Sequence, residues 1–315
     1  MTSGIHHISA IASDAQKTID FYSGVLGLRL VKQTVNQDDP GIYHLFFGDK
    51  EGFPGMDLTF FIFLPSQQGT IGSGMVSKIS FAVPIGSLEF WKKRFLEYHV
   101  HHEMQTHRFS RNRLIFYDPD HLQLELVEVT NEDKIDSSNI WSFEKITASN
   151  AIIQFYSATL RVSKKSSVES VITAVLGYTQ VDSIDTLSLF TVSQSSRAQL
   201  LEIEEINSTD SGVNAAGTIH HIAFRATDEK EQAEMRTAVE KQGLYPTDVI
   251  DRFYFKSVYF RTHAGILFEL ATDGPGFTAD QSIEDLGSTL SLPPFLLPLR
   301  AQIENNLPKL QIKKS

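Results

Sequence analysis

Two histidine pairs in apolar surroundings are the residues of this chain best suited to metal chemistry. Residues 4–11 read G-I-H-H-I-S-A-I, and residues 218–225 read T-I-H-H-I-A-F-R. The chain contains no cysteine, so a bound metal must be held by histidine and carboxylate side chains. The flanking isoleucines indicate strands, and two such strands can bring imidazoles from distant parts of the chain into one cavity.

A carboxylate of the required kind is Glu269, in the run G-I-L-F-E-L-A at residues 265–271. Burying a lone glutamate among apolar residues is costly unless it is paired or bound to a metal. Two histidines and one carboxylate form the facial triad of non-haem Fe(II) oxygen chemistry, and Mn(II) suits the same ligands. A strand histidine is more often simply hydrogen-bonded and a lone glutamate more often solvent-exposed, but the recurrence of the pair favours the metal interpretation.

Strand geometry limits how each histidine pair can be used. Neighbouring side chains of a regular strand face opposite sides of the sheet, so one histidine of each pair is expected to face the cavity. If His7 faces it, Ser9 does so too, and His221 would share its face with Ala223. This alternation argues against His6 and His7 both reaching the metal.

The histidine pairs begin two copies of a longer repeat. Residues 5–14 align with residues 219–228, and each copy continues into a helical pattern that ends at a glycine. Short strand-like runs follow each helix, at 28–35, 43–48, 56–63, 245–250, 254–261 and 265–271. Weaker copies begin at 76–83 and 155–162. The prediction is an α+β fold of four β-α-β-β-β modules paired into two half-barrel-like domains.

Three ligands of one metal must line one cavity, and this requirement decides how the modules pair. We expect the first and fourth modules to form the metal domain, residues 1–66 plus 215–275. The second and third would form a metal-free domain, residues 72–130 plus 145–205. Residues 276–315 are expected to form a C-terminal tail, because a proline-rich stretch within them cannot extend a sheet. The alternative is a site shared between subunits.

The second module offers weaker candidates for chemistry. Glu125 has the same offset as Glu269, but the sequence S-K-I-S at residues 77–80 replaces the histidine pair. We therefore expect an unmetallated copy there. The histidine-rich run 101–107 lies between a helix end and a strand, and a solvent-exposed face is expected for it.

Composition excludes several classes of function. A chain of 315 residues is too long for a typical single domain and predicts two. The net charge is −10 and the longest basic run is only Lys92-Lys93-Arg94, on a predicted helix, which argues against nucleic-acid binding. The N-terminal residues do not form a signal peptide, and no run approaches the roughly 18 apolar residues of a membrane span. We expect a cytoplasmic protein without nucleic-acid or membrane partners. The sequence does not fix the oligomeric state, and a homo-oligomer is compatible with it.

The whole pattern resembles the vicinal oxygen chelate superfamily, which includes glyoxalase, bleomycin resistance proteins and extradiol dioxygenases. More closely, the chain is similar to hydroquinone ring-cleaving dioxygenases of the 2,6-dichlorohydroquinone 1,2-dioxygenase type. The likeness is weak in the middle of the chain and specific at both ends. The matching segments are residues 4–11, 21–32, 35–49, 219–225, 251–261, 265–278 and 292–295.

This resemblance implies a mononuclear Fe(II) bound by the second histidine of each pair, His7 and His221, and by Glu269. The implied activity is an O2-dependent ring cleavage of a hydroquinone or related aromatic diol, in the detoxification of aromatic compounds. The implied partners are therefore the aromatic substrate and O2.

The resemblance also implies a set of catalytic residues around the metal: Arg252, Tyr259, His6 and His220. An arginine can stabilise a developing oxyanion, and a tyrosine can exchange a proton with a phenolic oxygen. The two histidines fall where the family has histidines behind its metal ligands.

Two other classes of function are alternatives. Glyoxalase-type lyases or isomerases use four ligands, and the terminal strand of the first module offers only Asp57 at its start. Thiol transferases of the fosfomycin-resistance kind use two histidines and a glutamate but are typically two-module chains. A non-enzymatic aromatic-drug-binding resistance protein would lack the metal ligands altogether.

Overall fold

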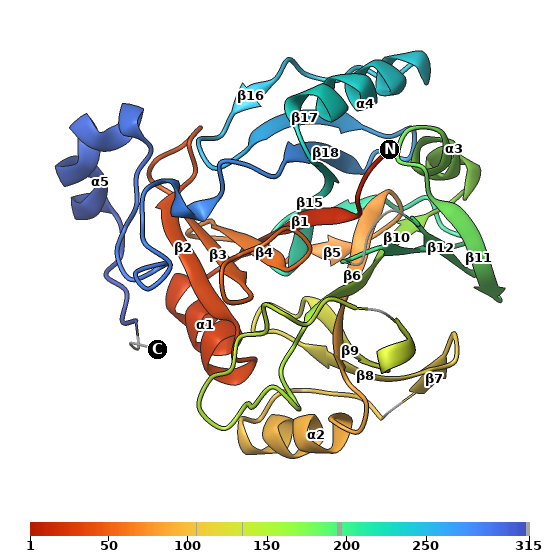
Figure 1. The fold of residues 1–315 in the computed structure, drawn as a ribbon, viewed down its shortest axis with the longest axis horizontal. Coiled ribbons are helices and arrows are strands. Elements are labelled where there is room, and N and C mark those ends of the chain that lie inside the picture. Colours follow the sequence, from red (N-terminus) through yellow and green to blue (C-terminus); the bar gives the residue numbers. More distant parts are fainter. Residues whose placement is uncertain (105, 134, 194–196, 313–315) are drawn as a thin grey trace.

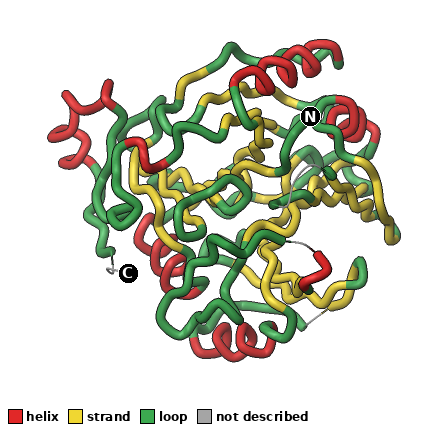
Figure 2. Tube along the Cα trace, viewed as in Figure 1, coloured by secondary structure: helices red, strands yellow, loops and turns green. Residues whose placement is uncertain are grey.

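The chain folds into two eight-stranded mixed sheets, and helices lie along their outer sides (Figure 1, Figure 2). The computed structural model describes residues 1–104, 106–133, 135–193 and 197–312. Apolar side chains from both sheets form one continuous hydrophobic core. The two curled sheets confirm the predicted α+β fold class of four modules in two half-barrel-like units.

The first sheet joins strands from the two ends of the chain. In spatial order its strands are β16 (Ile250–Asp251), β17 (Lys256–Arg261), β18 (Leu267–Thr272), β15 (Thr218–Ala226), β1 (Ile5–Ala12), β4 (Asp57–Ile62), β3 (Tyr43–Gly48) and β2 (Arg29–Val35). The strands β1 and β15, which carry the histidine pairs, are antiparallel neighbours at its centre. The repeat seen in the sequence is therefore a pseudo-twofold relation across this pair.

The second sheet has the same organisation and uses the middle of the chain. In spatial order its strands are β11 (Thr179–Ile184), β12 (Leu187–Thr191), β13 (Leu200–Glu205), β10 (Gln154–Val162), β6 (Met75–Pro84), β9 (Gln123–Val129), β8 (Arg111–Tyr117) and β7 (Thr106–Arg108). Its central pair, β6 and β10, is again antiparallel. A separate two-stranded ladder pairs β5 (Thr70–Ile71) with β14 (Gly212–Val213).

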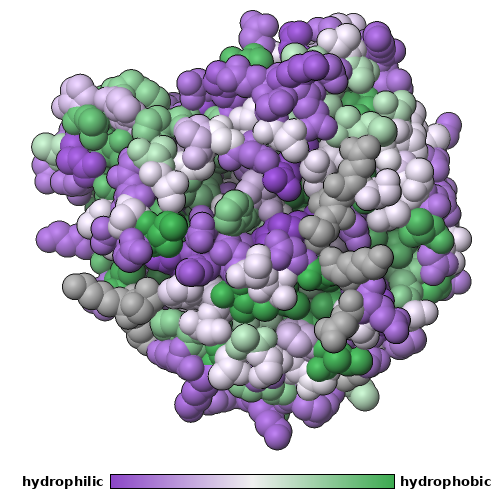
Figure 3. All heavy atoms as spheres, viewed as in Figure 1, coloured by the Kyte–Doolittle hydropathy of each residue, from purple (hydrophilic) through white to green (hydrophobic). Residues whose placement is uncertain are grey.

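One helix follows the first strand of each module. These are α1 (Ala15–Ile19), α2 (Leu88–Glu97), α3 (Ser166–Ala174) and α4 (Glu229–Lys241). Asp14 and Asp228 cap α1 and α4 by accepting hydrogen bonds from the backbone N–H groups of Lys17 and Glu231, as an N-cap carboxylate should. The exposed side of α4 is rich in charged residues, and hydrophilic atoms cover it in Figure 3.

Some elements differ from the sequence-based expectation. The predicted strand at 245–250 is irregular until Ile250, because Pro246 removes a ladder donor. The predicted helix after Asp14 continues beyond Ile19 as a π-helical segment, Asp20–Val25. The strand β11 has no counterpart among the predicted strands, since all its residues are exposed and polar residues dominate it.

The C-terminal segment packs at the edge of the first sheet, beyond β2. It contains a 3-10 helix, Pro294–Leu299, and α5 (Arg300–Asn306), which is at the left of Figure 1. The backbone N–H of Ser291 donates to the carbonyl of Gln33 in β2. Among the described residues, no helix is long and apolar enough to cross a membrane.

Candidate metal centre

The structure brings His7, His221 and Glu269 together from three adjacent strands, β1, β15 and β18. The Nε2 atoms of the two histidines lie 3.2 Å apart. The Oε2 atom of Glu269 lies 2.9 Å from Nε2 of His221 and 3.3 Å from Nε2 of His7. Donor atoms about 3 Å apart match adjacent positions around an ion with bonds of about 2.1 Å, so the three donors fit a divalent metal.

Glu269 is held so that one carboxylate oxygen faces the imidazoles. Its Oε1 accepts a 2.5 Å hydrogen bond from the hydroxyl of Ser257, on the neighbouring strand β17. Its Oε2 is fully buried and accepts no well-aligned hydrogen bond from the described residues. Burial would raise the pKa of Glu269, but His7 and His221 outweigh this effect and hold the pKa well below its usual range. An ionised, unsatisfied oxygen beside two imidazoles is suited to metal ligation.

A β-bulge at each histidine pair locally interrupts the regular alternation of side chains. The register between β1 and β15 shifts between Ile5 and His7, and again where Ser9 and Ala10 face His221 and Ile219. His6 and His220 are the extra residues of these two bulges, and a bulge re-aims the side chain that it displaces. Neither histidine therefore points away from its neighbour as a regular strand would require.

The bulges place His6 and His220 directly behind the two candidate ligands. Nδ1 of His6 lies 3.0 Å from Nδ1 of His7, and Nδ1 of His220 lies 2.8 Å from Nδ1 of His221. Nε2 of His6 lies 3.1 Å from the carbonyl oxygen of Thr272 and donates to it. Nδ1 of His6 is then an acceptor for the Nδ1–H of His7, which leaves the lone pair on Nε2 of His7 for a metal.

Burial keeps the two supporting imidazoles neutral. Desolvation, reinforced by the neighbouring His7, lowers the pKa of His6 to about 3. Desolvation, reinforced by His221, lowers the pKa of His220 to about 4. A neutral imidazole can accept a hydrogen bond at one nitrogen while it donates one at the other, and this is what orienting a neighbouring ligand requires.

Arg252 and Tyr259 border the same pocket from β17 and the turn before it. The guanidinium carbon of Arg252 lies 5.7 Å from the centre of the Tyr259 ring, and that ring meets the His221 ring edge-on at 5.7 Å. Burial, with the nearby Glu269, raises the pKa of Tyr259, so its phenol keeps its proton. A cation and a phenol therefore stand together beside the candidate ligands.

The pocket in front of the candidate ligands is small. Its volume is about 50 Å³. Aromatic and polar side chains both line it. The lining residues are His7, Ser9, Thr34, Val35, Asn36, Gln37, Asp38, His44, Phe46, Phe61, His221, Arg252, Tyr254, Phe255 and Tyr259. His6 and His220 do not belong to this lining, consistent with their place behind the ligands.

His44 is a pocket residue that the sequence did not single out. Its ring lies between those of Phe46 and Phe61, with centroids 4.0 and 4.1 Å away. Its Nε2 is 2.9 Å from the hydroxyl of Thr59, which in turn is 2.7 Å from the hydroxyl of Ser9. His44 lies near the start of β3, whose remaining residues are mostly apolar. A histidine in such a strand is the sequence signal that could have identified it.

Asp57 lies behind His7 and differs from Glu269 in its chemistry. The two residues His7 and Asp57 are register partners in β1 and β4, and a carboxylate oxygen of Asp57 lies within 4.8 Å of nitrogens of His6 and His7. Burial, followed by the charges of Asp49 and Glu269, raises the pKa of Asp57 well above its usual value. Its environment thus favours the neutral acid, whereas the environment of Glu269 favours the carboxylate.

Comparisons with known proteins agree with this architecture. The sequence profile of the Glyoxalase/Bleomycin resistance protein/Dioxygenase superfamily matches residues 4–126. A protein of Bacillus subtilis (strain 168) whose name describes a ring-cleaving dioxygenase, MhqO, is 40% identical over 99% of this chain and 98% of its own. The chain belongs to this superfamily. The resemblance inferred from the two histidine pairs is therefore confirmed.

Other members of the superfamily extend the likeness in sequence and in fold. The chlorohydroquinone/hydroquinone 1,2-dioxygenase of Sphingobium indicum is 30% identical over 93% of this chain and 92% of its own. The crystal structure of a Bacillus subtilis protein described as a dioxygenase matches with a TM-score of 0.94 and 39% identity, covering 100% of this chain and 99% of that chain. Glyoxalase I from Zea mays shares the fold, with a TM-score of 0.63 and 13% identity over 86% of this chain and 92% of that chain.

The position that would supply a fourth carboxylate holds a threonine in this member of the superfamily. Glu269 on β18 is the register partner of Ala223, and the equivalent pair in the first module is Thr59 and Ser9. The hydroxyl of Thr59 is engaged by Ser9 and His44. The first sheet therefore offers one terminal-strand carboxylate at this level, which matches the three-ligand expectation.

The interior of the second sheet carries an arginine where the first has its candidate metal site. Nη1 of Arg113 lies 2.7 Å from Glu125 and 2.9 Å from Glu202, and all three side chains are fully buried. Arg108 adds a second guanidinium, 2.9 Å from Glu202. The second sheet thus holds an internal cation beside Glu125. His101 and His107 of the histidine-rich run are exposed, and His102 is half-buried.

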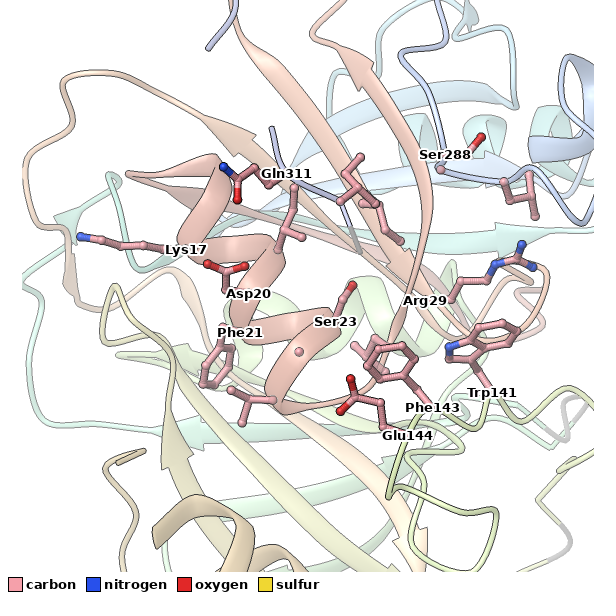
Figure 4. Close-up of a pocket in the computed structure, with 18 of the residues that line it drawn as sticks. Lys17, Asp20, Phe21, Ser23, Arg29, Trp141, Phe143, Glu144, Ser288 and Gln311 are labelled. Atoms are coloured by element: carbon pink, nitrogen blue, oxygen red, sulfur yellow. The ribbon is translucent and has the colours of Figure 1, made fainter. Parts of the chain in front are cut away.

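A larger cavity of about 1010 Å³ lies away from the candidate metal centre, between the π-helical segment and the C-terminal region (Figure 4). Phe21, Trp141 and Phe143 project into it, and the Arg29 guanidinium lies 4.9 Å from the Trp141 ring. That guanidinium donates to the backbone carbonyls of Lys50 and Ile283. The cavity contains none of the candidate metal ligands.

Proposed function

We propose that this chain is an Fe(II)-dependent ring-cleaving dioxygenase that uses O2 to open a hydroquinone or related aromatic diol. The observation that carries the proposal is the buried set of His7, His221 and Glu269 at the end of a pocket bordered by Arg252 and Tyr259. The name of the Sphingobium indicum relative, a chlorohydroquinone/hydroquinone 1,2-dioxygenase, supports this substrate class.

The roles of the residues follow from their surroundings. His7, His221 and Glu269 would hold Fe(II), which when bound supplies a path for electrons between the aromatic diol and O2. Three protein ligands leave adjacent positions open for small molecules. Ser257 fixes Glu269 through its other oxygen, so that Oε2 alone is presented. His6 and His220 orient the two imidazoles through their Nδ1 atoms.

Arg252 and Tyr259 would act on the oxygens of the diol. The guanidinium stabilises an oxyanion that develops on a phenolic oxygen. The Tyr259 hydroxyl, whose pKa is raised, keeps its proton and can donate a hydrogen bond to such an oxygen. Phe46, Phe61 and Phe255 supply flat apolar walls for the ring, as aromatic side chains commonly do in ligand pockets.

The glyoxalase-like alternative finds less support at this site. A lyase or isomerase of that kind uses a second terminal-strand carboxylate, and Thr59 takes that position here. The drug-binding alternative predicts a pocket without metal ligands, whereas three ionisable groups lie within 4.8 Å of one another. Both alternatives make different predictions for metal content and oxygen consumption.

Oxygen uptake tests the proposal. Protein purified without air and loaded with Fe(II) should consume O2 when methylhydroquinone or chlorohydroquinone is added, and the aromatic absorbance should disappear. Glu269→Ala should bind little iron and consume no O2. His107→Ala, which removes an exposed histidine from the rival cluster, is the matched control and should retain both. One iron per chain with no uptake on any hydroquinone or catechol would contradict the proposal.

A further inference from the structure

The pocket in front of the candidate metal centre is too small for an aromatic diol in this structure. Its volume of about 50 Å³ is well below the roughly 150 Å³ of a cavity that holds benzene. An aromatic diol is larger than benzene, so part of the lining must move before it can enter. Asn36, Gln37 and Asp38 belong to that lining and lie in the turn between β2 and β3.

The turn, residues 36–42, is shaped by its own hydrogen bonds. The backbone N–H of Asn36 donates to the carbonyl of Ile42, and the Asn36 side chain accepts from the N–H of Asp38. The Asp39 side chain accepts from the N–H of Gly41. A turn with this internal bonding can move as a unit, because its shape does not depend on the rest of the pocket.

The polar contacts that hold this turn over the pocket converge on Arg252. Asp38 makes a bidentate ion pair with its guanidinium, at 3.2 and 3.0 Å. The Gln37 amide donates a 2.7 Å hydrogen bond to its carbonyl oxygen. Within the described chain, these are the hydrogen bonds and ion pairs that join residues 36–42 to residues outside the turn and its flanking strands. Closure therefore depends on a residue that also borders the pocket.

We propose that residues 36–42 form a lid and that Asp38 is a positioning residue that holds Arg252 until an aromatic diol arrives. The proposal rests on the proposed function, because it assigns the ligand to the same pocket. A phenolate oxygen is an anion of the same charge as the Asp38 carboxylate and competes for the same guanidinium. Ligand entry thereby releases Asp38, and Arg252 passes from a carboxylate partner to the substrate oxygen.

The ion pair between Asp38 and Arg252 is weak enough for a lid that must open. The Asp38 side chain is 73% exposed while that of Arg252 is 20% exposed, so solvent screens the pair from one side. Exposed ion pairs contribute little free energy to the state that contains them, so the lid can open repeatedly. Removing the carboxylate should therefore shift the balance between closed and open forms by about fivefold rather than abolish the fold.

A single spin label can report the lid position without any ligand. The chain has no cysteine, so Gly41→Cys creates one labelling site on the exposed turn, and a side chain at Gly41 meets only the Asp39 carboxylate at 3.4 Å. In metal-free protein carrying this label, Asp38→Asn should raise the ratio of mobile to immobile nitroxide about fivefold. Asp248→Asn, which breaks the surface pair with Arg236, is the matched control and should leave the ratio unchanged.

Ligand association then tests the link to Arg252. Under argon, Fe(II)-loaded protein is mixed with 4-nitrocatechol in a stopped-flow instrument. Association should be about fivefold faster in Asp38→Asn than in wild type. Dissociation should be unchanged, because the bound state no longer contains the pair between Asp38 and Arg252. Equal label mobility in Asp38→Asn and Asp248→Asn overturns the lid. Raised mobility with unchanged association overturns the positioning role. Raised mobility with no binding of 4-nitrocatechol, and none of methylhydroquinone by calorimetry under argon, leaves the lid standing and contradicts the proposed function instead.

Discussion

Ser257 and Arg113 occupy the same strand position in the two sheets, and each contacts the carboxylate of a terminal-strand glutamate. Ser257 pairs in register with Ala271, two residues after Glu269. Arg113 pairs with Val127, two residues after Glu125. The short hydroxyl of Ser257 leaves space beside Glu269, whereas the guanidinium of Arg113 fills the space beside Glu125. The same framework thus surrounds a buried carboxylate with an arginine in one sheet and with two imidazoles in the other.

Ser257→Ala should weaken metal binding while leaving the fold intact. The substitution frees Oε1 of Glu269, so the carboxylate is no longer held with Oε2 toward the imidazoles. Loss of a supporting hydrogen bond of this kind costs about 10- to 100-fold in metal affinity. Competition with a fluorescent chelator measures it. Ser157→Ala, which removes a hydroxyl donor to Glu202 in the second sheet, should have no such effect.

His6→Ala should also lower metal affinity, by about tenfold or more. Without the imidazole of His6, the Nδ1–H of His7 loses its acceptor and the ring is free to rotate. The same chelator competition measures the change, and an unchanged affinity would contradict the orienting role. His99→Ala, at an exposed histidine outside the pocket, serves as the control.

Arg113→Met should destabilise the fold by about 3–5 kcal/mol, because it removes the fully buried one of the two guanidinium groups that contact both Glu125 and Glu202. Urea denaturation followed by circular dichroism measures the free energy of unfolding. Lys92→Met, which removes a surface pair with Glu89, should change it little. A loss below about 1 kcal/mol in Arg113→Met would show that the cluster is not a structural element.

Acid should weaken the fold through Glu125. Burial alone would raise the pKa of Glu125, but Lys78, Arg113 and Arg108 outweigh burial and lower it to about 2, from 4.5. A depressed carboxyl pKa stabilises the folded state above the unfolded value, and this stabilisation is lost as the pH falls from 4.5 towards 2. Urea midpoints of metal-free protein at about pH 6 and about pH 3 should differ less in Glu125→Gln than in wild type.

Much of this architecture can be read from the sequence, because repeated features have repeated causes. The two I-H-H-I stretches start equivalent strands, and equivalent strands meet at the centre of a pseudo-symmetric sheet. Asp14 and Asp228 cap the helices that follow these strands, because each side chain accepts a backbone N–H of the first turn. The polar, fully exposed strand β11 has no apolar alternation and therefore left no pattern to detect.

The parts that sequence reasoning missed depend on register. A β-bulge adds one residue to a strand without changing its composition, so the contact of His6 with His7 could not be anticipated from alternation. The contacts of Ser257 and Asp38 depend on which residues face each other across strands and turns. Serine and aspartate are common in strands and turns of this kind. The roles of Ser257 and Asp38 come from their partners, Glu269 and Arg252.

The order of synthesis matters for a sheet whose central strands come from opposite ends of the chain. A ribosome releases His7 long before His221, which follows 214 positions later. The strands β6 to β13 emerge between them and can form their sheet first, since domains generally fold as units during translation. The strand β1 must wait for β15 and β18, so the nascent protein cannot capture a metal with all three groups until Glu269 has left the ribosome.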